Sequence, residues 1–443
     1  MEEFDITIGQ AALITGTLVI AQGYVNFIIV PYSNIFGRRS VSLLFTLISI
    51  VASIWTAVAK SYGSLLAARV LYGIGTATSE SIMIQVVADM LFLHERGVMT
   101  GIYFTSYFSG AFIGPLIAGN IALHHGWRSF FWLCTALEGL VFSLLIFLLP
   151  ETKFHRDVQD PRQQPEANEK LGVPRTDDEP THADPQEVVG RGAPVRNQFN
   201  IATPPDKDWK GFLIRDIFTP VRIFFYPIIF WAGLMLAGPA NDTLAYSLTE
   251  STVFTAPPYN FNAGQVGYTN FAFWGGAMLG LVTAGPLSDW VASIATKRNN
   301  GIREAEMRLP ALIPFAVLAT IGIVVTGIGY ERTWSWPVII VVGYGACGLT
   351  STSMPTIAIA YAVDSYRPLS GEIMVVATVL KNTCGFGMSY WLPSLVARVG
   401  YLTPIMVNLA LTIGPAVLGI PMYFYGKELR KLTKDSPFHK IPL

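Results

Sequence analysis

Charged residues are scarce in this chain. Asp, Glu, Lys and Arg make up 14% of its 443 residues, whereas soluble domains carry about 25%. The 30 basic residues equal the 30 acidic ones, and this balance gives no support to nucleic-acid binding. Hydrophobic residues account for 51% of the chain, and the mean hydropathy is +0.44. Such a composition indicates an integral membrane protein embedded in a lipid bilayer.

Cysteine and histidine are also few, which bears on catalysis and metal binding. Cys134, Cys347 and Cys384 lie inside apolar runs and show neither a disulfide framework nor the spacing of a metal site. The 6 histidines lie outside these runs. We therefore expect no enzyme, no metal and no cofactor. The acidic residues Glu2 and Asp5 precede the first apolar run, without the basic segment of a signal peptide.

Long apolar runs are frequent. Runs of about 19 or more residues are long enough to cross a bilayer as helices, and they predict an all-α membrane protein with about eleven spans. They lie near 8–33, 41–59, 64–91, 98–122, 127–149, 223–247, 265–289, 309–330, 337–362, 371–396 and 402–425. Arg38, Arg39, Lys297 and Arg298 fall in one set of loops, and the opposite set holds few basic residues. Because basic loops stay in the cytoplasm, we expect the C-terminus inside and Met1 outside.

A polar, proline-rich segment divides these runs into two groups. Residues 152–222 are expected to form a disordered cytoplasmic linker. The end of the linker, from Trp209 to Phe218, is amphipathic and is expected to lie along the membrane surface. The expected parts of the chain are five spans in 1–151, the linker, six spans in 223–426 and a cytoplasmic tail in 427–443.

Two charged residues interrupt the run 64–91. Arg69 and Glu80 are eleven residues apart, close to three helical turns, so we expect them to share one helix face with Thr76. A charge at mid-membrane costs a few kcal/mol or more and marks a substrate, ion or proton path. The run is interpreted as one wall of a transport pathway. The alternative is a structural pairing of Glu80 with Arg69 or with a neighbouring helix.

Several local patterns resemble the major facilitator superfamily. Residues 30–39 read VPYSNIFGRR, similar to the signature GxxxDxxGRR, with Asn34 at the Asp position before Gly37, Arg38 and Arg39. Its counterpart in the second half, GPLSD, ends at Asp289. The remaining matches are Arg69, Gly73 and Gly75 to the RxxxGxG motif, and Gly101, Gly110, Gly114 and Pro115 to the motif typical of the family's antiporters.

Within this family, the chain looks closest to the fungal drug:proton antiporters and their Hol-type branch, which is linked to organic cations such as histidinol and polyamines. The resemblance implies two inverted-repeat halves with twelve spans, and proton-coupled transport of a small organic molecule. When the chain is aligned at Arg38 and Arg39, its first run becomes the family's second helix. We therefore expect the first helix to be missing, through a shortened gene model or an isoform.

The resemblance also assigns roles to single residues. Because the substrate cavity lies between the two halves, Glu80 is the candidate carboxylate that exchanges a proton for a cationic substrate. Asp242, beside Asn241, could contact substrate or hold the outer gate. Lys381 and Asn382 could counter a cavity carboxylate, or Lys381 could reach toward the membrane surface.

Aromatic and gating residues complete the candidate site. Tyr246, Trp274 and Tyr344 could contact a cation through their ring faces, or serve packing alone. Arg38 and Arg39 with Asn34 are expected to form a cytoplasmic latch, and the alternative is a plain positive-inside anchor. Gly110, Gly114 and Pro115 are expected to let helices pack closely and to bend their span.

The expected partners are a small-molecule substrate, protons and the lipid bilayer, and the chain is expected to be monomeric. The plasma membrane is the expected location, with the vacuolar membrane as the alternative. The antiporter motif favours export, whereas the Hol-type resemblance favours uptake. A non-transporting membrane sensor or an inactive truncated transporter remains as the competing interpretation, favoured by the missing helix and opposed by the intact Arg69 and Glu80.

Overall fold

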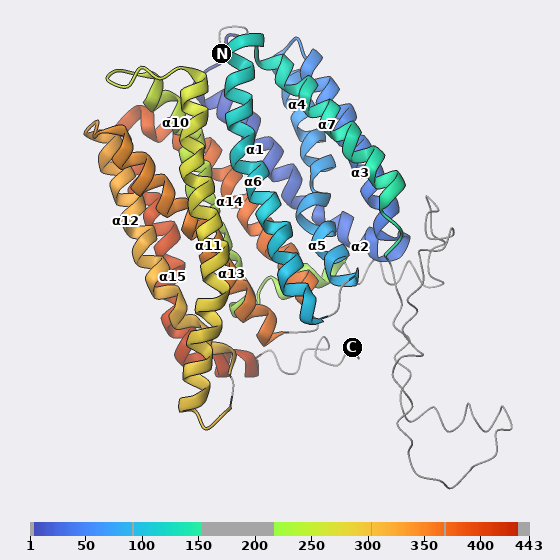
Figure 1. Ribbon diagram of the computed structural model, residues 1–443, viewed down its shortest axis with the longest axis vertical. Helices are drawn as coiled ribbons and strands as arrows, with labels where there is room; N and C mark the ends of the chain where they lie inside the picture. Colours follow the sequence, from blue (N-terminus) through green and yellow to red (C-terminus); the bar gives the residue numbers. More distant parts are fainter. Residues whose placement is uncertain (1–3, 91–92, 153–216, 303, 367–368, 433–443) are drawn as a thin grey trace, which may run out of the picture.

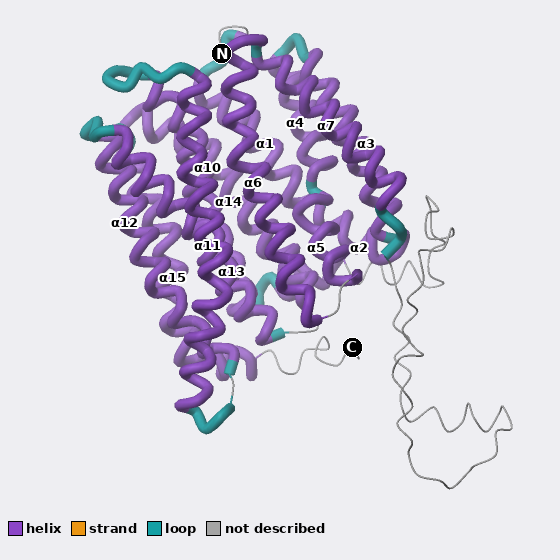
Figure 2. Tube along the Cα trace, viewed as in Figure 1, coloured by secondary structure: helices purple, strands orange, loops and turns teal. Residues whose placement is uncertain are grey.

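The structure, a computed structural model, describes residues 4–90, 93–152, 217–302, 304–366 and 369–432. Regular structure in these ranges is helical, and the long helices run side by side as one bundle (Figures 1 and 2). Lipid offers no hydrogen bonds, so a chain that crosses a membrane must satisfy its backbone groups within helices. The apolar runs of the sequence supply the residues for these helices.

The helices form two groups in chain order. The first group is α1 (Ile8–Tyr24), α2 (Asn26–Phe36), α3 (Arg38–Val58), α4 (Tyr62–Thr76), α5 (Thr78–Met90), α6 (Leu93–His125) and α7 (Trp127–Leu148). The second group is α10 (Pro227–Thr255), α11 (Ala263–Arg298), η4 (Ala305–Ala311), α12 (Leu312–Glu331), η5 (Val338–Tyr344), α13 (Gly345–Ser365), α14 (Ser370–Val399) and α15 (Leu402–Leu432).

Local sequence sets several helix ends. Thr7 begins α1 by accepting a hydrogen bond from the backbone N of Gln10 at 3.3 Å, and Asn262 begins α11 in the same way through Gln265, at 2.8 Å. These side chains satisfy backbone donors that the first turn leaves unpaired. Gly37 separates α2 from α3 at a φ of 94°, a conformation that favours glycine.

The number of membrane crossings follows from helix length and composition. Among the described residues, eight helices are long and apolar enough to cross a membrane, or up to nine if the bent pair Ile217–Ile223 and Pro227–Thr255 is one span. When α1 is counted with α2, α4 with α5 and η5 with α13, the long helices of the described ranges pass along the bundle eleven times. The nine do not include α4–α5, which carries Arg69 and Glu80, or α14, which carries Glu372, Lys381 and Arg398.

The two groups meet mainly along two helix pairs, with smaller contacts of α14 with α2 and α5. α1 packs against α14, and α6 packs against α11, as Figure 1 shows for the latter pair in cyan and yellow. The α1–α14 contact depends on small residues: a Cβ placed on Gly23 would lie 2.6 Å from the Cβ of Asn382, and one on Gly16 would lie 2.8 Å from the Cβ of Ser389. Close approach of this kind is typical of helix pairs in membranes.

The expected linker lies almost entirely outside the described residues, including most of the amphipathic stretch from Trp209. The first residues of the expected tail are helical, because α15 continues to Leu432, and the cytoplasmic location of the tail stays a prediction. Lys427 and Arg430 extend this helix and form ion pairs with Glu304 and Glu306, at 2.6 and 2.5 Å. These pairs let the basic residues remain helical beyond the apolar run.

Candidate functional site

The run 64–91 is not one continuous helix. α4 ends at Thr76 and α5 begins at Thr78, with Ala77 between them. The hydroxyl of Thr76 donates to the carbonyl oxygen of Tyr72 at 3.0 Å. Hydroxyls that bond back to the preceding turn bend helices, and Thr76 therefore lies at the break that separates the two segments.

Because of this break, Arg69 and Glu80 do not share one face, and that prediction is wrong. The guanidinium of Arg69 lies 4.6 Å from the centre of the Phe131 ring on α7. Glu80 instead faces Tyr107 of α6 and Lys381 of α14. Arg69 thus stabilises packing within the first helix group, and Glu80 faces the second.

Glu80 lines a cavity of about 400 Å³ between the two helix groups. The walls come from α1, α5 and α6 on one side and from α10, α11, α13 and α14 on the other. Glu80 and Lys381 are the two charged residues among those that line it. The cavity therefore presents one carboxylate and one ammonium group in otherwise neutral surroundings.

The two charges form an ion pair across the helix groups. Lys381 Nζ lies 2.6 Å from Glu80 Oε1, and the Tyr107 hydroxyl donates to the same oxygen at 2.7 Å. The Glu80 side chain is 7% exposed and that of Lys381 20%. Glu80 Oε2 is buried, and Asn382 of α14 lies close enough to interact with the same carboxylate. Oε1 thus carries both of these contacts, one from each helix group.

Aromatic rings of α6 form one wall of the cavity, and sequence reasoning missed them. Tyr103, Tyr107, Phe108 and Phe112 all line it. Phe112 stacks on Phe273 of α11, with ring centres 5.6 Å apart and planes at 9°. The signal was present as an aromatic pattern near three- and four-residue spacing, which places the rings on one helix face. Aromatic faces attract cations, so this wall suits a positively charged ligand.

Asp242 and Asn241 lie away from this cavity. Asp242 is 1% exposed and accepts hydrogen bonds from the Asn408 amide and from the Thr412 hydroxyl, the latter at 2.8 Å. Both donors belong to α15. Asn241 is buried against Gly385 of α14. The arrangement joins α10 to its neighbours within the second helix group.

The aromatic residues named from the sequence also pack outside the cavity wall. Tyr246 and Tyr344 are fully buried and stack with ring centres 5.4 Å apart. Trp274 donates from Nε1 to the hydroxyl of Ser109 at 2.9 Å and so joins α11 to α6. Asn382 is buried against Gly23 of α1. Of the ten residues named for the pathway, Glu80 and Lys381 are the two that line the cavity.

The VPYSNIFGRR stretch forms a joint between α2, α3 and α7. Arg38 donates to Asn34 Oδ1 at 2.7 Å. Arg39 is 2% exposed and donates to the last carbonyl groups of α7, including that of Ile146 at 2.8 Å. In return, Glu151 accepts from the backbone N of Arg38 at 2.8 Å. Each charge thus meets the helix end of opposite partial charge.

The corresponding residue of the second half, Asp289, pairs with a more distant arginine. Arg308 lies 3.1 Å from Asp289 and 3.0 Å from Asp364. The nearby Lys297 and Arg298 end α11. The arginine therefore joins the last part of α11 to the end of α13, which sequence spacing alone does not indicate.

The glycines of the antiporter-like motif differ from one another. Gly101 lies near the start of α6. A Cβ placed on Gly110 or Gly114 would meet no atom within 4 Å in the described structure, so the close packing expected there is not formed. The close helix packing is found at Gly119 instead, because a Cβ on this residue would overlap the carbonyl oxygen of Ala263 on α11. Pro115 lies within α6, where its carbonyl oxygen approaches Gly267 of α11.

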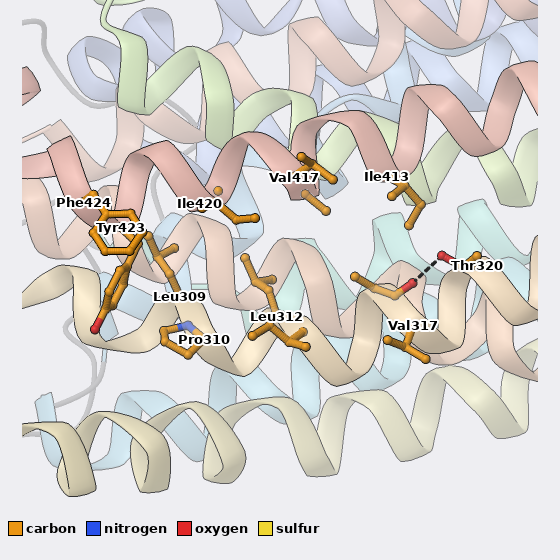
Figure 3. Close-up of a pocket in the computed structure, with 14 residues that line it drawn as sticks. Leu309, Pro310, Leu312, Val317, Thr320, Ile413, Val417, Ile420, Tyr423 and Phe424 are labelled. Carbon is orange, nitrogen blue, oxygen red and sulfur yellow. Dashed lines mark hydrogen bonds between the residues drawn. The ribbon is translucent and has the colours of Figure 1, made fainter.

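A second hollow has different chemistry. It measures about 520 Å³ and lies between α12 and α15 (Figure 3). Thr320 and Tyr423 bring the only polar side chains among the residues that line it, and the Thr320 hydroxyl already donates to Ala316 O at 2.8 Å. No group of His, Cys, Asp and Glu in the described ranges is placed to hold a metal. The cavity between the two helix groups, lined by Glu80 and Lys381, is therefore the candidate substrate site.

Comparison with known proteins agrees with this architecture. The chain is 30% identical to an uncharacterised major-facilitator-type transporter of Schizosaccharomyces pombe, over 94% of this chain and 77% of that one. It is 25% identical to protein HOL1 of Saccharomyces cerevisiae (95% and 80%), and 26% identical to a probable efflux pump of Aspergillus flavus (98% and 97%). The human organic anion transporter MFSD10 has the same fold, with a TM-score of 0.59 at 16% identity, over 92% of this chain and 83% of that one. The Major Facilitator Superfamily model matches residues 1–370, and the chain belongs to this family of secondary transporters.

Proposed function

We propose that this transporter carries a small organic cation in exchange for protons, with Glu80 as the cation-binding carboxylate. The observation that supports the proposal is the Glu80 carboxylate in an aromatic-walled cavity between the two helix groups. One carboxylate suits a ligand with one positive charge, and the Tyr107 and Phe108 rings suit a planar or alkylated cation. The resemblance to HOL1 and to fungal efflux pumps supports a small organic molecule as cargo.

Lys381 has a defined part in this proposal. Its ammonium group lies where the charge of a substrate would lie, 2.6 Å from Glu80. An incoming cation must displace it, and the displaced lysine then turns toward the cavity. A proton on Glu80 also releases Lys381, so a proton and a substrate compete for one carboxylate, which couples their movements.

Orientation and location complete the proposal. The ends of α3, α11 and α15 that carry basic residues face the cytoplasm, as do the linker and the C-terminus. The transporter acts as a monomer in the plasma membrane. Arg38 with Asn34, and Arg308 with Asp289, hold the cytoplasmic ends of the two helix groups during the cycle.

The test is binding of 1-methyl-4-phenylpyridinium, an aromatic monocation, to purified protein. Glu80→Gln keeps the side-chain shape and removes the charge, so we expect affinity to fall about tenfold or more, equivalent to about 1.4 kcal/mol. Glu428→Gln, at an exposed pair with Lys431 on α15, is the matched control and should bind normally. Equal affinity of wild type and Glu80→Gln would contradict the proposal, as would competition by the anion para-aminohippurate.

A further inference from the structure

A second buried carboxylate lies close to the cavity and takes no part in the site described so far. Glu250 of α10 is 7% exposed. It accepts hydrogen bonds from the Thr269 hydroxyl at 3.3 Å and from the Asn270 amide at 3.3 and 3.4 Å. Both donors are neutral residues of α11. Within the described residues, no basic side chain forms an ion pair with Glu250.

Among the described residues, the other groups that interact with Glu250 are two tyrosines, which are uncharged at neutral pH. Tyr330 of α12 and Tyr344 of η5 lie close enough to interact with it electrostatically. Both rings are buried in the same apolar cluster, with Phe254 and Phe273. An ionised carboxylate in such surroundings is costly without a cation, and two long hydrogen bonds from neutral donors compensate little. The neutral, protonated form is accommodated more easily.

Position distinguishes Glu250 from Asp242, a buried carboxylate that also forms no ion pair within the described residues. Asn270, which donates to Glu250, lines the same cavity as Glu80 and Lys381. Glu250 is therefore one side chain away from the cavity. Asp242 instead bonds Asn408 and Thr412 of α15, and neither of these lines the cavity. Asp242 is thus the matched control, a buried carboxylate whose hydrogen-bond partners do not line the cavity.

We propose that Glu250 is a second proton-binding site, which takes up and releases a proton through the cavity in each transport cycle. The proposal rests on the proposed function, in which Glu80 binds the cation and exchanges the first proton. Two protons exchanged for one monovalent cation move one net positive charge per cycle, whereas a one-for-one exchange moves none. Transport then responds to the membrane potential, at about 2.3 kcal/mol per charge for 100 mV.

The first arm of the experiment needs no substrate. The carbonyl stretch of a protonated carboxyl group is distinct from that of a carboxylate in infrared difference spectra recorded between two pH values. We expect Glu250→Gln to remove one protonated-carboxyl band that Asp242→Asn leaves in place, and Glu250→Asp to retain a band. A spectrum unchanged by Glu250→Gln overturns the proposal.

The second arm uses liposomes and 1-methyl-4-phenylpyridinium. Exchange of labelled for unlabelled cation at equal pH involves no net proton movement, so we expect Glu250→Gln to stay within about twofold of wild type. Under a gradient of one pH unit, the loss of one coupled proton lowers the limiting accumulation ratio about tenfold. We also expect Glu250→Gln to lose the response to an imposed potential, and Glu250→Asp to keep it.

The arms separate the two proposals. A voltage response in Glu250→Gln equal to that of wild type overturns the second proton site. Wild-type protein that fails to exchange 1-methyl-4-phenylpyridinium contradicts the proposed cation transport, and the infrared arm still decides the role of Glu250.

Discussion

At the scale of single residues, the pair Glu80–Lys381 gives the empty cavity an internal counter-ion. A cavity carboxylate without a cation would be costly to keep charged, and Lys381 Nζ, 2.6 Å away, offsets part of that cost. The same contact makes the lysine a competitor of any cationic substrate. The affinity for a cationic substrate therefore depends on how much more strongly Glu80 binds the substrate than it binds Lys381.

This competition makes Lys381→Gln informative. Removal of the ammonium group leaves Glu80 free for the ligand, so we expect affinity for 1-methyl-4-phenylpyridinium to rise about tenfold, measured by equilibrium binding. Lys381→Arg retains the charge and should stay near wild type. Unchanged or lower affinity of Lys381→Gln for this cation would mean that the lysine does not compete with it for Glu80, and would contradict the prediction.

The charged part of this site could be predicted from the sequence, because a charge within an apolar run is rare and costly. Neutral lining residues could not be predicted. The Ser351 hydroxyl donates to Gly348 O at 2.8 Å and that of Thr243 to Pro239 O at 3.3 Å, as hydroxyls in any membrane helix do. Nothing in the sequence separates these residues, or Asn270, from those that face lipid.

At the scale of helices, hydropathy predicted where the chain crosses the bundle, but not where a helix breaks. The run 64–91 is apolar on both sides of Ala77, so its composition continues where its geometry does not. Because of the break, α4 and α5 contact different parts of the molecule. Gly75 of α4 lies against the backbone of Ser49 on α3, which fixes α4, while α5 carries Glu80 toward α14.

The contact of α6 with α11 provides a second test at this scale. At Gly119 a larger side chain would overlap Ala263 O, so Gly119→Val forces these helices apart. Overpacking typically costs about 1–3 kcal/mol of stability, and we expect a lowered Tm together with at least tenfold slower transport in liposomes. Gly110→Ala, at an open position of the same helix, is the control and should transport normally. Normal transport by Gly119→Val would show that the approach is not needed.

At the scale of the whole molecule, charge distribution predicts orientation. Lys297, Arg298, Lys427 and Arg430 lie at one end of the bundle, the end to which α11 and α15 run (Figure 1). We expect epitope tags at residue 170 and at the C-terminus to be reached by antibody only in permeabilised cells, and a tag at residue 255 to be reached in intact cells. Labelling of the tags at 170 and 255 from the same side would contradict this orientation.

The joint of Arg39 and Glu151 bears on the order in which the molecule is assembled. Its partners lie on α3 and just after α7, so the joint requires nothing beyond residue 151. Domains generally fold as units, N-terminal first, during synthesis at about 5–20 residues per second. Residues 152–226 separate this joint from the start of α10. The first helix group can thus pack several seconds before the ribosome has synthesised the helices that complete the cavity. During that time Glu80 is present in the nascent chain without Lys381.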